Sequence, residues 1–502
     1  MPLPLSAGAA SLLRRSGIGV HPLDWRLPPI ETYPVVVAFA QSWAGKALLF
    51  AAFAVLLRPL SGMWLEMTIA AAAVSLAGRY RHYAALVATA VLLSRTPYWF
   101  NIEALETTIL REGLEGTIRT GYVLAGTLAA CVPVAAAALW LARRFRNHPL
   151  GRRPVLVQHI VCAGLIGLAA SQLLRGLPQV VLWSATATFL AYFWFLAYAL
   201  MDQRQREPAP LLLHFATFHP FFASPSVVPM GKGAANWRSV EAGTAEELAV
   251  TQLKALKLLA WAFFLKVLLW LFHRVVYDGI GVPPLEAAFE TFLAGGDLSA
   301  PLGLASIVAN FPEQLLVMAL WGHVIIAVAR LAGFRLLRNT WRPLSSRTIA
   351  EFWNRYFYYF KEILVQIYFY PTYVRWFKRH PRLRLAFATF MAAGVGNFLF
   401  HFILQNHRIA EFGLLEALAL SQTYAFYCVL LVAGIVLSQL RARRPDPDAG
   451  WWRGQLVPSL GVALFYAFLS FFDGPQRHVD LTQHFAFLFH VFGVDSWIQA
   501  TG

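Results

Sequence analysis

Long apolar runs recur along the whole chain, and many are close to 20 residues long. An α-helix rises about 1.5 Å per residue, so about 20 residues cross a hydrocarbon core roughly 30 Å thick. Lipid offers the backbone no hydrogen bonds, and continuous runs satisfy it as helices rather than as the alternating strands of a barrel. The pattern predicts an all-α polytopic membrane protein with about eleven transmembrane helices. The expected spans are residues 33–57, 63–77, 82–94, 121–142, 155–174, 179–201, 257–277, 312–332, 385–404, 412–437 and 456–472.

The placement of charge supports a membrane protein. Only 14% of the residues are charged, whereas soluble domains carry about 25%. The formal net charge of +16 would suit a nucleic-acid-binding protein, but the basic residues lie in short loops between the apolar runs. Such loops typically face anionic lipid, so the lipid bilayer is the expected partner and nucleic acid is not. Cys131, Cys162 and Cys428 lie scattered in apolar runs and are expected to be core residues, neither a disulfide nor a metal site.

Basic and acidic loops alternate along the chain. Residues 275–329 contain no Lys or Arg but carry four acidic residues in their first half, and residues 101–116 carry four glutamates. Basic loops stay in the cytoplasm, so we expect a multi-pass protein with a cytoplasmic N-terminus. Residues 1–27 lack an apolar core followed by a cleavage site, so no cleaved signal peptide is expected. The basic loops are residues 143–153, 203–206, 335–347, 375–384 and 441–453.

Two apolar stretches lie between basic loops expected on the same side of the membrane. Residues 208–233 are rich in proline, and residues 356–374 are rich in aromatic side chains. Each is expected to be a re-entrant or interfacial element, which needs protein or a wet cavity to satisfy its backbone. The chain then divides into a cytoplasmic N-terminal segment (1–32), N-terminal transmembrane helices (33–206), a core with re-entrant segments (207–437), and a C-terminal basic loop, transmembrane helix and tail (438–502).

His401 is the leading candidate for chemistry, because an ionisable group inside an apolar span defaults to a functional role. Asn397 lies four residues earlier, on the same helical face, where it can orient the imidazole. Gly394 and Gly396 permit close approach of another helix or an acyl chain. A neutral imidazole can accept a hydroxyl proton at neutral pH. A histidine that only packs and hydrogen-bonds near a helix end is the alternative.

Asn354 is the second candidate, within the aromatic segment 351–356. A neutral amide can polarise a thioester carbonyl or hold a hydroxyl without the cost of burying a charge. Its alternative is a cap or an interfacial hydrogen bond. His159, His323 and His490 also have apolar surroundings, and two facing histidines could hold a haem. Zinc-protease, esterase-elbow and phosphate-loop signatures are absent from the sequence, which leaves transporters open.

These residues together resemble one family. The segments 339–346 and 351–356, followed by an apolar helix ending in His401, are similar to the membrane-bound O-acyltransferase (MBOAT) family, in a bacterial-type member. The upstream segment 218–225, which contains His219, also looks like a proline-bearing segment of that family. The resemblance covers about residues 211–437, which makes 207–437 an acyltransferase-like core.

The resemblance implies a ring of tilted helices around a central tunnel in the bacterial inner membrane. It implies an acyltransferase that moves an acyl group from acyl-coenzyme A or an acyl carrier to a hydroxyl of a lipid, saccharide or other acceptor. His401 would be the general base and Asn354 the family's asparagine; the thioester would be a co-substrate, with no tightly bound cofactor and no metal. Phe400 and Phe402 flank His401 where many members have Trp and Gly. A non-catalytic protein of this fold and a membrane transporter or flippase-like protein remain alternatives.

Overall fold

The computed structural model describes residues 29–95, 102–205, 207–218, 220–222, 232–441 and 450–494. Within these ranges the protein is all-helical, with 78% helix and no strand, and Glu241 and Phe334 form an isolated antiparallel bridge. Most of the segment 1–32 lies outside the described residues, as do His219 and residues 223–225 of the proline-bearing segment. The prediction of an all-helical protein is therefore confirmed over the described part of the chain.

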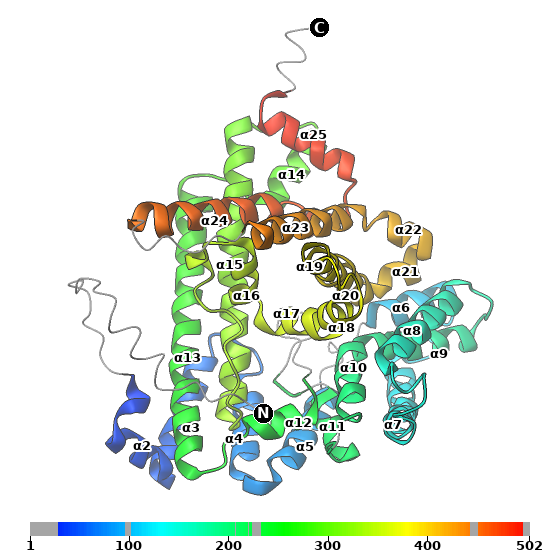
Figure 1. Ribbon diagram of the computed structural model, residues 1–502, viewed down its shortest axis with the longest axis vertical. Helices are drawn as coiled ribbons and strands as arrows, with labels where there is room; N and C mark the ends of the chain where they lie inside the picture. Colours follow the sequence, from blue (N-terminus) through cyan, green and yellow to red (C-terminus); the bar gives the residue numbers. More distant parts are fainter. Residues whose placement is uncertain are drawn as a thin grey trace.

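The α-helices follow one another with short connections (Figure 1). In chain order they are α2 (Pro34–Gln41), α3 (Trp43–Leu57), α4 (Trp64–Leu76), α5 (Arg81–Arg95), α6 (Ile102–Arg111), α7 (Thr120–Arg144), α8 (Pro154–Ala170), α9 (Leu177–Ala191), α10 (Phe193–Asp202), α11 (Leu211–Phe218), α12 (Gly233–Val240), α13 (Ala245–Phe272), α14 (Leu285–Leu293), α15 (Ala300–Leu331), α16 (Ile349–Tyr356), α17 (Tyr358–Leu364), α18 (Tyr370–Arg375), α19 (Pro381–Thr389), α20 (Asn397–Leu404), α21 (Asn406–Phe412), α22 (Leu414–Ala419), α23 (Gln422–Leu440), α24 (Val457–Ser470) and α25 (Leu481–Val491). Four π-helical segments extend α13, join α17 to α18, join α19 to α20 and precede α24; they are His273–Gly279, Val365–Phe369, Phe390–Gly396 and Trp452–Leu456.

Helices long and apolar enough to cross a membrane number five among the described residues, or up to seven if each of two bent pairs counts as one span. This supports a membrane protein with several transmembrane helices. The expected number of about eleven is not confirmed by these lengths, since α4 and α8, for example, are apolar but have only 13 and 17 residues. The five are Thr120–Arg144, Ala245–Gly279, Ala300–Leu331, Pro381–Leu404 and Leu414–Leu440.

Two of the expected spans are sharply bent. Residues 33–57 form α2 and α3, which meet at 94°, and residues 179–201 form α9 and α10, which meet at 60°. At the first bend, the Ser42 side chain caps α3 by accepting a hydrogen bond from the Gly45 backbone nitrogen at 3.0 Å. A Cβ atom on Gly45 would lie 1.9 Å from the Phe39 carbonyl oxygen. The bend therefore requires glycine at this position.

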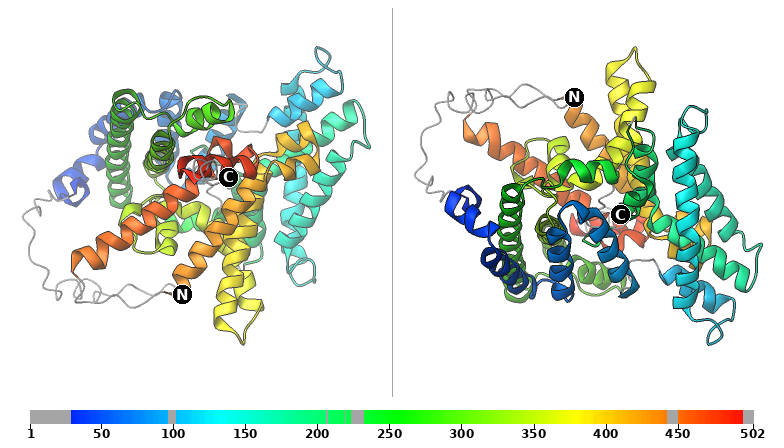
Figure 2. Two further views of the ribbon diagram at one scale, coloured as in Figure 1. Left: turned by 90° about the horizontal axis from the view of Figure 1, so that it is seen from above. Right: turned by 90° about the horizontal axis from the view of Figure 1, so that it is seen from below.

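The long helices do not form a parallel bundle. α13 and α15 pack against each other along the long axis of the molecule, whereas α19 and α20 are seen almost end-on in Figure 1 and lengthwise in Figure 2. A membrane has a single normal, and transmembrane helices usually tilt from it by no more than about 40°. At least one of these two sets is therefore strongly tilted.

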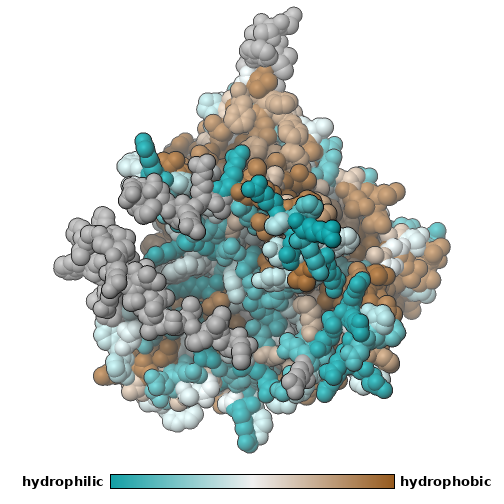
Figure 3. Space-filling view, in the orientation of Figure 1, coloured by the Kyte–Doolittle hydropathy of each residue, from teal (hydrophilic) through white to brown (hydrophobic). Residues whose placement is uncertain are grey.

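Two arginine-rich loops project from the same face of the molecule. The loop after α18 and the loop after α7 point to one side, and α6 lies toward the opposite side (Figure 2). Hydrophilic side chains gather over the middle of the face seen in Figure 1, and hydrophobic side chains line its upper and right edges (Figure 3). We call the side that carries these two loops the arginine face. Two of the five basic loops expected from the sequence therefore lie on one side of the molecule.

The stretch 356–374, expected to be re-entrant or interfacial, is helical from Tyr358 to Arg375. Its buried side chains, including Phe360, Ile363 and Leu364, join a hydrophobic cluster with residues of α9, α10 and α20. This cluster packs α17 against the helix that carries His401. The stretch 208–233 contains α11 and the start of α12, and much of what joins them lies outside the described residues.

Candidate functional site

The helix that carries His401 changes its winding just before that residue. The segment Phe390–Gly396 is π-helical and continues directly into α20. A Cβ atom on Gly396 would lie 2.4 Å from a ring carbon of Tyr368, and one on Gly394 would lie 3.2 Å from Val432. The two glycines therefore let neighbouring helices approach closely, as the sequence predicts. π-Helical insertions are frequent at functional sites.

His401 is partly buried and surrounded by aromatic rings. The centroid of its imidazole lies 4.7 Å from that of Tyr424, 5.3 Å from that of Phe400 and 5.8 Å from that of Phe360. Its ring nitrogens form no hydrogen bond with any other described residue. The imidazole is thus held in place by packing alone, and both of its nitrogens are free to engage a substrate.

Asn397 lies one helical turn before His401 and is fully buried. Its Oδ1 accepts a hydrogen bond from the Tyr424 hydroxyl at 3.0 Å. Its Nδ2 has no hydrogen-bond partner among the described residues. Because a buried N–H group without a partner is costly, this amide is well suited to donate to a bound molecule.

An ion pair between Arg477 and Asp473 lies next to Tyr424. Arg477 lies 3.6 Å from an Asp473 oxygen, and its guanidinium is 5.5 Å from the centroid of the Tyr424 ring. With the Gln405 amide oriented so that its oxygen faces the guanidinium, Arg477 Nε donates to it at 3.1 Å. Burial raises the pKa of the Asp473 carboxyl to about 6, although Arg477 opposes this shift. Burial, assisted by Arg408 and Arg477, lowers the pKa of His478 to about 3.

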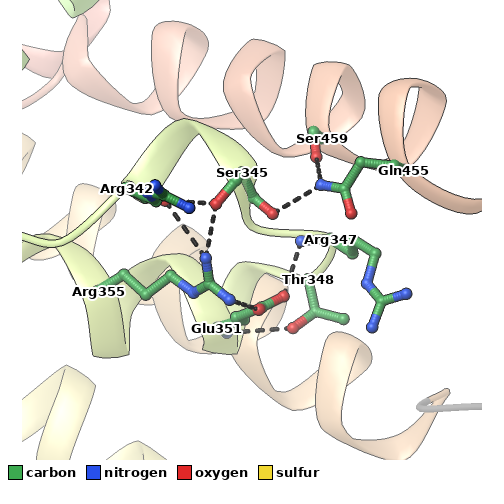
Figure 4. A network of polar contacts seen from close by, with 8 residues as sticks. All are labelled: Arg342, Ser345, Arg347, Thr348, Glu351, Arg355, Gln455 and Ser459. Carbon is green, nitrogen blue, oxygen red and sulfur yellow. Dashed lines mark hydrogen bonds and ion pairs between the residues drawn. The ribbon is translucent and has the colours of Figure 1, made fainter. Parts of the chain in front are cut away.

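Asn354 occupies a different environment. It lies in α16, its side chain is exposed, and it forms no hydrogen bond with the other described residues. Thr348 caps α16 by accepting from the Glu351 backbone nitrogen at 3.1 Å. Arg355, next to Asn354, pairs with Glu351 and donates to the Ser345 hydroxyl at 2.6 Å (Figure 4). Asn354 therefore borders a network of charged side chains.

The structure does not bring Asn354 and His401 into contact. α16 meets α23 where the Ala350 backbone nitrogen donates to the Ser438 hydroxyl at 3.5 Å, whereas His401 meets α23 at Tyr424. Those two positions on α23 are 14 residues, or about 21 Å, apart along the helix. The ring centroid of Trp353, which is next to Asn354 in the sequence, lies 6.0 Å from that of Phe360, and the Phe360 ring in turn contacts His401. Aromatic packing links the two regions, and Asn397 is the amide that, like His401, contacts Tyr424.

The competing histidines already have partners. His159 bonds to the Tyr368 hydroxyl and to the Val155 carbonyl, each at 2.7 Å. His323 bonds to the Ala319 carbonyl at 2.6 Å and His490 to the Leu298 carbonyl at 2.7 Å. Both ring nitrogens of His159 are therefore engaged, and one ring nitrogen each of His323 and His490. Among the described residues, no group of three or more His, Cys, Asp or Glu side chains could hold a metal ion.

Tyr424, Asp473 and Arg477 did not stand out in the sequence. Tyr424 is one of 17 tyrosines in an aromatic-rich chain, so its type alone carries no signal. The short segment 473–478 reads Asp-Gly-Pro-Gln-Arg-His directly after an apolar run. Several polar residues in a row at the end of an expected span were the one sequence feature that could have pointed to Asp473 and Arg477.

No protein-family model matches the chain, and no curated protein matches it. The assignment of a function therefore depends on the residues around His401 and on the sequence segments that resemble the acyltransferases.

Proposed function

We propose that the protein is a membrane-bound O-acyltransferase of the MBOAT type, which transfers an acyl group from a thioester to a hydroxyl. The observation that carries the proposal is the environment of His401. An imidazole held by Phe360, Phe400 and Tyr424, without a hydrogen bond to the described protein, keeps its nitrogens for a substrate. Such a group is costly in a membrane protein unless it is used.

In the proposed reaction His401 removes the proton of the acceptor hydroxyl. The oxygen attacks the thioester carbonyl carbon, a carbon–oxygen bond forms, and the carbon–sulfur bond breaks. The departing thiolate takes the proton back from the imidazolium, so the products are an ester and a free thiol. A positioned general base of this kind contributes about a hundred- to ten-thousand-fold.

The two asparagines have separate roles in this proposal. The unpaired Nδ2 of Asn397 donates to the oxygen that becomes negative during attack, and Tyr424 holds the amide in position by donating to its oxygen at 3.0 Å. Asn354, exposed beside the charged network of α16, contacts the donor on its way to His401. In this proposal Asn354, the asparagine that the resemblance singles out, lies on the path of the thioester donor.

The arginine face is the side from which the donor approaches. Coenzyme A and acyl carriers bear phosphate, which basic loops attract. His401 is about 30 Å along the helix from Pro381, where the loop after α18 ends. The proposal therefore needs a tunnel that leads the thioester from the arginine face to His401, and an acceptor that arrives from the opposite side. It includes the ring of about eleven spans, the bacterial inner membrane, a cytoplasmic N-terminus and the absence of a tightly bound cofactor.

Thiol release by the purified protein in detergent tests the proposal. Acetyl-coenzyme A and palmitoyl-coenzyme A are the donor probes, with a polysaccharide, a glycerolipid and a peptide bearing serine as acceptors. We expect release that depends on both donor length and acceptor, with the ester found by mass spectrometry. Transport of an acceptor into vesicles without thiol release from either donor would favour a transporter and contradict the proposal.

A further inference from the structure

A large apolar cavity lies away from His401, among α7, α8, α9 and α10, with α5 and α11 at its edges. Its volume is about 1370 Å³, more than the roughly 300–1000 Å³ that suits a drug-sized ligand. Small residues of α7 open this space because they leave room beside the helix. The lining includes Gly126, Ala130, Ala135, Ala138, Leu165 and Phe189.

The cavity follows almost the whole of α7. Its lining extends from Tyr122 near the start of the helix to Phe145 just after its end, about 35 Å of helix. A hydrocarbon core is roughly 30 Å thick. The cavity is therefore long enough for extended acyl chains to lie along it.

A helical wall separates this cavity from the candidate site. Phe189 and Leu196 line the cavity, whereas Trp194, on the same helical pair, stacks on Phe400 with ring centroids 5.4 Å apart. α9 and α10 thus present one face to the cavity and the other to the cluster around His401. The occupant of the cavity is distinct from a substrate held at His401.

The two ends of the cavity carry opposite charge. At one end, Phe145, His148 and Gly151 line it within the loop 143–153 of the arginine face. That loop holds five exposed arginines, none of which forms an ion pair within the described part of the chain; they are Arg143, Arg144, Arg146, Arg152 and Arg153. Near the other end, at the start of α7, a polar pocket is lined by Glu103, Glu106 and Glu115.

We propose that this cavity binds an anionic phospholipid, with its acyl chains along α7 and its phosphate at the arginines of the loop 143–153. The apolar walls exclude a polar occupant, and the unpaired arginines favour an anionic headgroup over a zwitterionic one. The glutamates at the far end disfavour the opposite orientation. The proposal does not depend on acyl transfer, so either can fail without the other.

Lipid retention by the full-length protein tests this site. The protein is reconstituted with phosphatidylglycerol and phosphatidylcholine in equal amounts, extracted with mild detergent, and analysed by native mass spectrometry. We expect retained phosphatidylglycerol in clear excess. A phosphatidylglycerol with a photoreactive acyl chain should label α7, α8 or α9 in the wild-type protein. Equal retention of both lipids, or labelling only elsewhere, would overturn the proposal.

Two pairs of variants locate the headgroup and the chains. Changing Arg143, Arg144, Arg152 and Arg153 to Gln should lower retained phosphatidylglycerol by at least about tenfold, since each arginine near anionic lipid is worth about a factor of five. The matched control changes Arg375, Lys378, Arg379 and Arg382 to Gln; it removes the same charge from the other loop of the arginine face and should retain lipid as the wild-type does.

The second pair places a bulky ring on α7. Ala138 lines the cavity, whereas Ala137 is exposed and does not. Ala138→Phe should lose most of the bound lipid and its photolabel, and Ala137→Phe should keep both. Equal loss in the test variant and its control, in either pair, would show a general effect of surface composition and contradict a defined site. Displacement of the label by palmitoyl-coenzyme A but not by phosphatidylglycerol would identify a different occupant and also contradict it.

Discussion

The two ends of α23 present different kinds of polar contact. Near Ser438, Arg355 and Glu351 of α16 form a network with Ser345, which lies just before that helix (Figure 4). The exposed Asn354 is next to Arg355 in the same helix. Near Tyr424, the Oδ1 atom of the buried Asn397 accepts a hydrogen bond from the tyrosine hydroxyl, and His401 lies among aromatic rings. The contacts near Ser438 are between partly exposed charged side chains, whereas those near Tyr424 are between neutral side chains enclosed by apolar ones.

This difference bears on where chemistry is feasible. Exposed ion pairs contribute only about 0–1 kcal/mol and are screened by salt. An enclosed polar group without a partner costs about 1–3 kcal/mol, so its persistence suggests a use. By this criterion the unpaired Nδ2 of Asn397 is a better candidate than the exposed amide of Asn354 for donating a hydrogen bond to a reacting oxygen. In the proposed reaction, catalysis therefore takes place at the Tyr424 end of α23 and the donor enters at the Ser438 end.

The largest expected effect is at His401. His401→Ala should lower acyl transfer by about a hundred- to ten-thousand-fold, since it removes the general base. The measurement is the steady-state rate of thiol release in detergent. His273→Ala, at a partly exposed histidine that pairs with Glu313 at the end of α13, is the control and should retain wild-type turnover. Wild-type turnover in His401→Ala would remove this residue from the mechanism.

The next effect is at Asn397. Asn397→Ala should lower kcat by about a hundred- to a thousand-fold, as expected for loss of one donor to a developing oxyanion. Asn406→Ala is the matched control, because Asn406 is also buried but donates to the Ile403 carbonyl at 3.0 Å. We expect that variant to lose stability and keep kcat. If both variants only lower the melting temperature, the amide of Asn397 is structural.

A smaller effect is expected at Asn354. Asn354→Ala should raise the KM for the donor by less than about tenfold and leave kcat nearly unchanged, because a contact made equally with substrate and transition state affects KM alone. The measurement is thiol release over a range of donor concentration. A loss of kcat as large as that of His401→Ala would indicate that the reaction takes place near the Ser438 end of α23, which would contradict the proposed roles of the two ends.

The smallest effect concerns pH. The folded pKa of Asp473 is about 6, raised by burial above an ordinary value near 3.8. The stability that this carboxyl contributes is therefore fully present below about pH 4 and is lost as the pH rises through 6. Melting temperatures measured between pH 4 and 7 should fall less steeply in Asp473→Asn than in the wild-type. The exposed Asp297→Asn is the control; an unchanged slope in Asp473→Asn would contradict the shifted pKa.

Apolar periodicity was sufficient to locate most helices. Residues 121–142 were expected to span, and α7 is Thr120–Arg144. The same signal underestimated α13, which begins at Ala245, because its first turns carry Glu246, Glu247 and Lys254 and read as a polar loop. Helix existence follows from local pattern, but the polar ends of a helix look like loops in the sequence.

The bends in the helices and the contacts of the candidate site were harder to predict from the sequence. Nothing in the run 33–57 distinguishes a straight span from the 94° bend at Ser42, since Ser and Gly are tolerated in both. The contact between His401 and Tyr424 joins α20 to α23, and the pair Asp473–Arg477 comes from beyond α24. These contacts depend on how helices pack, which a single sequence does not encode locally. His401 and Asn397 both contact Tyr424, and their spacing of four residues places them on one helical face, which the sequence does encode locally.

Chemical rescue tests the central claim most directly. His401→Gly removes the imidazole and leaves space beside Tyr424 and Phe360. The account predicts slow thiol release by this variant and acceleration when imidazole is added, in the presence of donor and hydroxyl acceptor. A folded His401→Gly that turns over at the wild-type rate without imidazole would contradict a general base at position 401.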